Sequence, residues 1–166
     1  MDQGGLEKKE WWLYLTENQR DLFSQAVTLL TRERVFKEAL FNDYSFIVFP
    51  AAKAYEGFLK KLLFDLGFIT SAQYSGEHFR IGKSLNPNLP VRYRKSDWVY
   101  MKLENYCRNG DVASRLWDTW KTSRNHVFHW FPQREGYISL KEAEEHINMI
   151  VQVIDETFTE CRLKNA

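Results

Sequence analysis

The sequence predicts an all-α protein, a single-domain bundle of about five helices. Three observations favour this fold. Apolar residues recur at helical spacing in several long stretches, two of these stretches open with a capping-box pair, and nothing reads as a pair of neighbouring strands. The chain has 166 residues, 44% of them apolar, with 12 Phe, 8 Tyr and 6 Trp. That is enough for one well-packed core and makes two domains or a repeat array improbable.

Residues 1–15 form an N-terminal arm whose role the sequence leaves open. Their aromatic cluster at 11–15 is too short to distinguish a strand from a docking segment. The helical domain is expected to occupy residues 16–166.

The first helix of this domain is predicted over about 17–40. Thr16 and Gln19 have the spacing of a capping box, and apolar residues then recur every three or four positions. Asn42 and Asp43 break the pattern.

A second helix is predicted over about 51–66, with Gly67 as its C-terminal stop. Pro50 must lie in its first turn or kink it. Gly57, in the middle, forfeits about 1 kcal/mol of helix propensity relative to Ala. We therefore expect another element, most simply a second helix, to approach the backbone closely there.

A long loop is predicted over 68–96, where glycines and prolines interrupt any periodicity. The stretch from His78 to Lys95 contains no carboxylate, although the whole chain has a net charge of only +1. A chain of phosphates could bind there, and an ordinary solvated connection is the alternative. The cations of this stretch are Arg80, Lys83, Arg92, Arg94 and Lys95.

Three further helices complete the prediction. They run over about 97–109 with Gly110 as the stop, from Asp111 to a break at Trp130-Phe131-Pro132, and from a Ser139/Glu142 capping box to about Leu163. Pro132 should force Phe131 out of helical geometry.

The composition also predicts an intracellular, cytoplasmic protein with no membrane partner. No apolar run approaches the roughly 18 residues of a membrane-spanning helix, and the first 30 residues lack the order of a secretion signal. Cys107 and Cys161 have no nearby cysteine or histidine that would suggest a metal or redox motif, so we expect two inert, unpaired thiols.

The fourth helix carries an arginine where its apolar stripe calls for an aliphatic residue. Arg124 fills the gap between Trp120 and Phe128. Since a guanidinium keeps its charge, it needs a carboxylate or a phosphate there. We expect Glu56 to be its partner, with Glu104 as the weaker candidate. A purely structural Arg–Glu pair explains the pattern as well.

Two histidines follow the arginine. His129 lies five positions on, about 140° around an ideal helix, so the two side chains converge only if the helix end loosens, if the arginine reaches round, or if a second copy contributes. His126 and His129 could form a metal pair, but no third ligand lies nearby in sequence, and we expect no metal and no cofactor.

The segment Arg124-Asn-His-Val-Phe-His129 on the penultimate helix of a small bundle resembles the motif of the HEPN superfamily. Together with the runs from Phe49 to Leu62 and from Phe79 to Lys83, it is most similar to the toxin domain of the RNase LS family. The resemblance covers about residues 40–160.

This resemblance implies a metal-independent endoribonuclease of a toxin–antitoxin or antiviral defence system. His129 would transfer the proton of the 2′-hydroxyl and Arg124 would stabilise the phosphorane, with Asn125 and Glu56 as supporting residues. A homodimer would supply the second proton-transfer group, and an antitoxin or regulatory protein would be a further partner. The loop cations and Lys60 would bind RNA, and Tyr93 could stack on a base.

Three functional classes stay open at this stage. The first is the ribonuclease, the second is a non-catalytic HEPN-like module that dimerises or binds RNA or nucleotides, and the third is a helical interaction domain with no nucleic-acid partner. One departure concerns a related branch in which a tyrosine two residues after the histidine is modified. Phe131 occupies that position here, so modification there is excluded.

Overall fold

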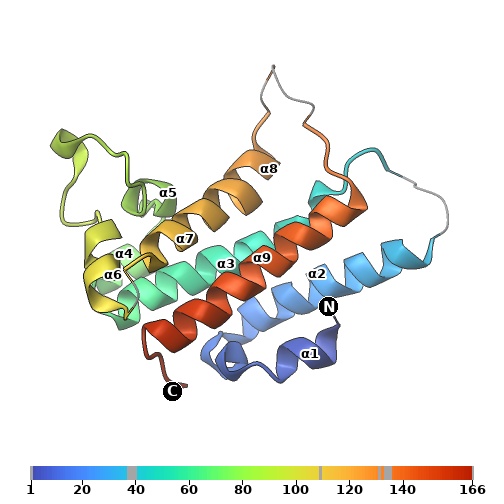
Figure 1. Ribbon diagram of the computed structural model, residues 1–166, viewed down its shortest axis with the longest axis horizontal. Helices are drawn as coiled ribbons and strands as arrows, with labels where there is room; N and C mark the ends of the chain where they lie inside the picture. The colour runs from blue at the N-terminus through green and yellow to red at the C-terminus, as the bar shows by residue number, and fades with distance from the viewer. Residues whose placement is uncertain (1, 37–40, 109, 131, 133–135, 166) are drawn as a thin grey trace.

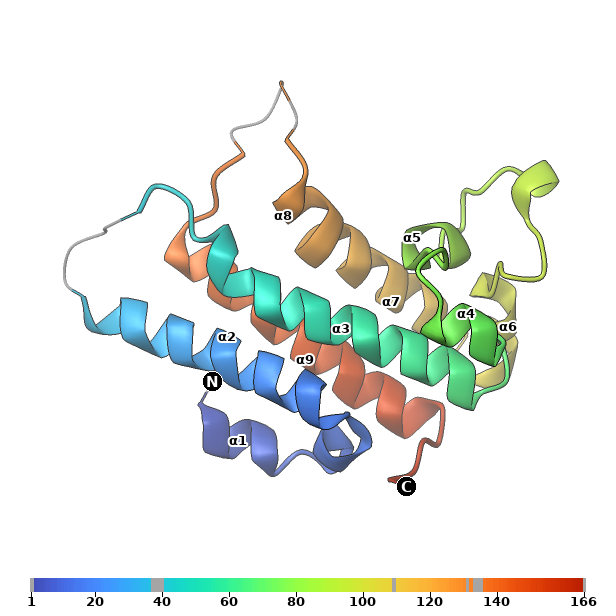
Figure 2. The ribbon, with the colours of Figure 1, turned by 180° about the vertical axis from the view of Figure 1, so that it is seen from behind.

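A computed structural model describes residues 2–36, 41–108, 110–130, 132 and 136–165. All regular structure in these residues is helical, which confirms the predicted all-α class. Figures 1 and 2 show α2, α3 and α9 side by side, with the run from α7 to α8 lying over α3 and α9 on the side away from α2. The core lies between these four helical runs.

The five predicted helices are all present. Thr16 with Gln19 and Ser139 with Glu142 form complete capping boxes, as expected. Three of the helices end earlier than predicted, at Val35, Tyr106 and Phe128, because the backbone of the next residue is extended in each case. The five are α2 (Glu17–Val35), α3 (Ser45–Asp65), α6 (Tyr100–Tyr106), the run of α7 (Val112–Trp120), η3 (Lys121–Asn125) and α8 (His126–Phe128), and α9 (Leu140–Glu160).

Residues 2–15 pack onto the bundle. They form α1 (Gln3–Glu7) and η1 (Glu10–Tyr14), and Leu6 and Trp11 are buried in the core. The Trp11 indole donates to Asp155 of α9 at 2.9 Å. The segment is therefore a docking segment and not a strand, the two alternatives that the sequence left open.

Helix α3 begins six residues earlier than predicted, so Pro50 lies in its interior and not in the first turn. The proline ring removes one backbone hydrogen bond, but Ile47 and Val48 are fully buried in the same turns. Tyr44, immediately before the helix, donates its backbone N–H to the carbonyl of Ile138 at 2.9 Å. Burial and this anchor outweigh the lost bond.

The close approach expected at Gly57 is present. A Cβ at this position would lie 2.5 Å from Nε2 of Gln19, so α2 packs directly on the α3 backbone. Gly67 ends the helix with a φ of 69°, in the left-handed region that favours glycine. Other faces of α3 contact α5 (Ile81–Ser84), η3 and, through Phe49 and Phe128, α8.

The long connection after α3 contains three short helical segments, α4 (Ser71–Ser75), α5 (Ile81–Ser84) and η2 (Val91–Tyr93). Its first part is anchored by buried side chains, among them Phe79, Ile81 and Leu85. The glycine-rich and proline-rich sequence hid these anchors because they are spaced irregularly.

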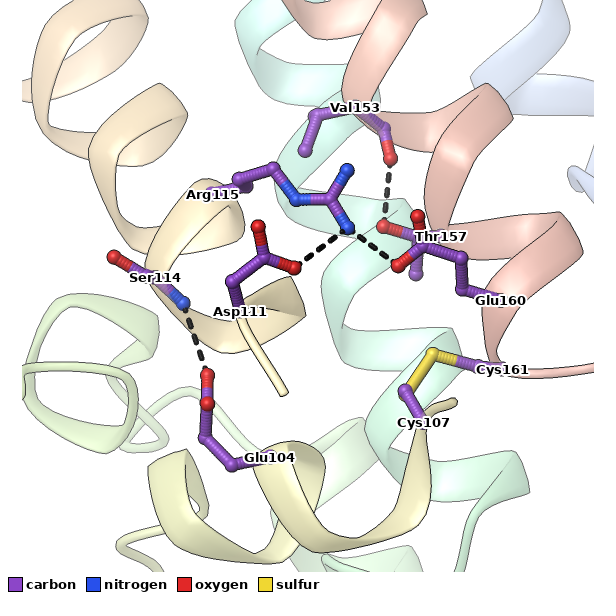
Figure 3. The surroundings of a disulfide bond; sticks show 9 residues. All are labelled: Glu104, Cys107, Asp111, Ser114, Arg115, Val153, Thr157, Glu160 and Cys161. Carbon is purple, nitrogen blue, oxygen red and sulfur yellow. Dashed lines mark hydrogen bonds and ion pairs between the residues drawn. A yellow bond between two sulfur atoms is a disulfide. The ribbon is translucent and has the colours of Figure 1, made fainter. Parts of the chain in front are cut away.

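The expectation of two unpaired thiols is wrong. Cys107, after α6, and Cys161, after α9, form a disulfide that joins positions 54 residues apart (Figure 3). The backbone N–H of Arg108 also donates to the carbonyl of Glu160 at 3.1 Å. The two helix ends therefore meet in space although nothing in the sequence marks them as neighbours.

Arg115 of α7 lies close to this disulfide. Its guanidinium pairs with Glu160 of α9 and, at 3.2 Å, with Asp111 (Figure 3). It also pairs with Glu156 of α9. These carboxylates raise the pKa of Arg115 against the opposing effect of desolvation. We call the disulfide and this ion-pair cluster the clamped end of the bundle. Among the described helices, none has the length and apolar character needed to cross a membrane.

Candidate active site

The helical run that carries Arg124 changes its pitch at the start of the motif, because η3 includes Arg124 and Asn125. At η3 the backbone N–H of His126 donates to the carbonyl of Lys121, five residues back, which makes this a π-helical turn. Such turns insert one extra residue into an α-helix and occur frequently at functional sites.

The π-turn is held by contacts to α9. Ser123 is fully buried, and its Oγ lies 3.4 Å from Nδ1 of His146 and 3.5 Å from Sδ of Met149. Burial lowers the pKa of His146, and the nearby Glu142 and Glu145 oppose that shift. Neither Ser123 nor His146 was predicted as part of the site.

The convergence of Arg124 and His129 follows from the π-turn and the helix end together. An ideal α-helix would place the two side chains about 140° apart. Here the extra residue changes their relative angle, and His129 leaves the helix with φ −114° and ψ 132°. Both residues consequently line the same cavity. The loosened helix end was one of the three routes that the sequence left open.

This cavity has a volume of about 340 Å³, and its lining residues come from α3 and from the segment that runs from η3 to His129. It combines cations, one carboxylate, an imidazole and two aromatic rings. Its lining residues are Phe49, Ala52, Lys53, Glu56, Arg124, Phe128 and His129.

Arg124 is held loosely from two sides. Its Nη2 lies 3.9 Å from Oε2 of Glu56, and its guanidinium lies over the Trp120 ring at 4.9 Å. Glu56 is thus the partner, as predicted. The alternative candidate, Glu104, is engaged elsewhere, since it accepts the backbone N–H of Ser114 at 3.3 Å. About a third of each side chain in the Arg124–Glu56 pair is exposed, so a ligand can reach both.

Asn125 and Lys60 lie outside the cavity lining, as do the five predicted loop cations. Asn125 is half-buried in the last position of η3, and Lys60 is half-buried one turn after Glu56 on α3. Lys53, Phe49 and Phe128 line the cavity but were not predicted. Phe49 and Lys53 could have been predicted from the sequence, because their helical spacing places them on the same face of α3 as Glu56.

Two of the loop cations are held within the chain by an ion pair or by two hydrogen bonds. Lys83 pairs with Asp97 at 3.1 Å, just beyond the carboxylate-free stretch. Arg94 donates to the carbonyls of Leu89 and Pro87, at 2.7 and 3.1 Å. Arg94 therefore holds the loop together, a role that the charge pattern alone did not indicate.

The other three loop cations are more open. Arg80 is exposed and donates to the backbone carbonyl of Glu77, Arg92 lies over the Tyr93 ring at 4.9 Å, and Lys95 is exposed. These side chains are available to a polyanion.

The basic connection reaches the candidate site through Trp120. A Cβ on Gly82 of α5 would lie 3.1 Å from the Trp120 indole nitrogen, and Arg124 lies over the same indole. The α5 part of the connection therefore packs against the ring that also contacts Arg124.

Among the residues that the structure describes, no group of three or more His, Cys, Asp or Glu side chains is placed to hold a metal ion. Comparisons of the chain with protein-family models, with curated proteins and with solved structures each found no match. The case for a function therefore depends on the geometry of the cavity and on the resemblance of its motif.

Proposed function

We propose that the protein is a metal-independent endoribonuclease that cleaves RNA by attack of the 2′-hydroxyl on the adjacent phosphate. One observation carries this proposal: Arg124, His129 and Glu56 line a single cavity. RNA brings its own nucleophile, so the reaction needs groups that move protons and a cation that stabilises the phosphorane.

Each of the three residues fits a distinct role. The His129 imidazole takes the proton of the 2′-hydroxyl as the new bond from oxygen to phosphorus forms. The Arg124 guanidinium donates hydrogen bonds to the phosphorane oxygens. Glu56, 3.9 Å away, orients the guanidinium without saturating its donors.

A second copy of the chain completes the proposed reaction. The departing 5′-oxygen needs a proton, and a second His129 facing the first across a homodimer would supply it. The products are a 2′,3′-cyclic phosphate and a 5′-hydroxyl. The proposal also includes an antitoxin or regulatory protein that restrains the activity, as the motif's resemblance to toxin nucleases implies.

The test is cleavage of RNA in excess EDTA, with the chemistry of the product ends mapped. We expect His129→Ala to lower the cleavage rate about 10²- to 10⁴-fold and Arg124→Ala about 10²- to 10³-fold. Lys141→Ala, an exposed cation of α9 outside the cavity, is the control and should cut normally. Loss of cutting in EDTA, or unchanged cutting by His129→Ala, would contradict the proposal.

A non-catalytic RNA-binding or nucleotide-binding module is the second candidate. One observation favours it: Arg124 already has Glu56 and the Trp120 ring as partners, as a structural arginine would. This reading predicts salt-sensitive RNA binding without turnover, and a large loss of stability in Arg124→Ala.

A further inference from the structure

We propose that the cavity binds one unpaired nucleotide, with the base against the Phe49 ring and the phosphate between Lys53 and Arg124. The inference extends the proposed function by defining its substrate as single-stranded RNA. Binding can nevertheless be measured without cleavage, so the two proposals can fail separately.

Phe49 is the first reason for this proposal. It is 54% exposed although its neighbours Val48 and Pro50 are buried, and its ring lines the cavity. An edge contact with Phe128, at 5.5 Å between ring centroids and 84° between ring planes, fixes the orientation of the ring. An exposed, oriented aromatic face is the surface on which proteins stack the bases of single strands.

The position of Phe49 relative to the cations is the second reason. Lys53 follows it by four residues and Lys60 by eleven, so the three positions lie on one face of α3. The backbone positions of Phe49 and Lys53 are separated by about 6 Å of helix rise. A nucleotide likewise presents a flat base next to its own phosphate. The order of aromatic ring and then cation therefore suits one nucleotide, and Lys60 continues the track.

The charge of the cavity separates a nucleotide from an apolar protein segment. Lys53 and Arg124 contribute two positive charges to the lining, and Glu56 contributes one negative charge. An apolar side chain covering the cavity would desolvate the unmatched cation at considerable cost. A nucleotide supplies a phosphate for the cations and a flat apolar face for Phe49 at the same time.

The size of the cavity favours an unpaired nucleotide over a duplex. About 340 Å³ is at the small end of the roughly 300–1,000 Å³ of small-ligand pockets. A base inside a double helix is stacked and paired on both sides, and bringing it to Phe49 would require unstacking it. A base in a single strand pays much less of that cost.

The experiment measures binding of 2′-fluoro RNA, which lacks the nucleophilic hydroxyl and cannot be cut by this route. Fluorescence anisotropy gives the dissociation constants of the full-length protein for a single-stranded octamer, for the same octamer with abasic sugars, and for a duplex. Phe49→Leu removes the aromatic face and Phe49→Tyr keeps it. Phe64→Leu is the matched control. Phe64 is an exposed phenylalanine of the same helix, about 22 Å along the helix axis from Phe49, and its ring stacks on Tyr74.

We expect Phe49→Leu to weaken binding of the octamer about tenfold, the loss typical of one base stacked on an aromatic ring. Phe49→Tyr and Phe64→Leu should stay within about twofold of the unchanged protein. The abasic octamer and the duplex should bind more weakly, and the affinity of the abasic octamer should not depend on Phe49. Circular dichroism checks that each variant is folded.

Equal affinity of the Phe49→Leu variant and the unchanged protein for the octamer would overturn the inference. So would an equal loss for the abasic octamer, or a duplex that binds as tightly as the single strand. If binding depends on Phe49 but the protein does not cut RNA, the nucleotide site stands and the ribonuclease proposal fails. If it cuts RNA without dependence on Phe49, only the nucleotide site is wrong.

Discussion

Two arginines of one helical run occupy opposite kinds of environment. Arg115 pairs with three carboxylates and lies beside a disulfide at the clamped end of the bundle. Arg124 lies nine residues on, where among the described residues its one carboxylate partner is Glu56 at 3.9 Å. Their side chains are exposed to similar degrees, 30% and 36%, so accessibility does not distinguish them.

What distinguishes the two arginines is how many of their hydrogen-bond donors have partners. A guanidinium has five N–H donors. Both terminal nitrogens of Arg115 pair with carboxylates of its own chain, and only its buried Nε has no partner among the described residues. Arg124 keeps donors free for an anion. We therefore propose that the clamped end of the bundle stabilises the fold and that the end with Arg124 binds a ligand, and three predictions test this division.

The largest expected effect comes from opening the disulfide. In the chain-entropy account, a bridge that closes a loop of 54 residues stabilises the fold by about 4 kcal/mol. The double variant Cys107→Ala/Cys161→Ala should therefore unfold on the order of 10 °C lower than the disulfide-bonded protein in calorimetry.

The same variant tests whether the two ends are independent. At a temperature where it is fully folded, its affinity for the single-stranded octamer should be unchanged. Reductant should lower the melting temperature of the unchanged protein and not that of the variant. A large loss of affinity in the folded variant would show that the clamped end also shapes the cavity.

The second prediction compares the two arginines directly. Arg115→Ala leaves Glu156 and Glu160 close together without their cation, and should cost about 2–3 kcal/mol of unfolding free energy. Arg124→Ala removes one long, partly exposed ion pair and one ring contact, and should cost about 1 kcal/mol or less.

Urea denaturation of the two variants, beside the unchanged protein, gives both values. If Arg124→Ala lowers the unfolding free energy as much as Arg115→Ala, Arg124 is a structural residue. That result would favour the non-catalytic RNA-binding or nucleotide-binding module. A small cost with loss of RNA cleavage supports a functional role.

Local signals were sufficient to predict the scaffold. The two capping boxes depend on residues three positions apart, and the apolar residues of α2, α3 and α9 recur every three or four positions. The Arg124–Glu56 pair was also predictable, because a charge on an apolar stripe requires a partner and few carboxylates could reach it. These arguments need only the helical period and the cost of an unpaired charge.

Tertiary contacts decided what the sequence could not. Cys107 and Cys161 meet because the ends of α6 and α9 meet, and no spacing rule reports that. The π-turn likewise depends on a contact between two helices that are distant in sequence. Ser123 reaches His146 on another helix, and helical geometry applied to the motif alone places Arg124 and His129 on different faces.

The smallest expected effect concerns the contact that holds this π-turn, and it appears as a dependence on pH. The pKa of His146 is lowered by burial, which outweighs the attraction of Glu142 and Glu145 for the protonated ring. Above the unfolded pKa of about 6.5 both states hold a neutral imidazole. As the pH falls below that value, the unfolded chain takes up a proton before the folded one, so stability decreases until the folded pKa is passed.

His146→Gln should lose less stability than the unchanged protein between pH 7.5 and 5.0, measured as melting temperature, because the other titrating groups are common to both. Equal losses would mean that His146 titrates normally and that its contact with Ser123 does not depend on a neutral ring.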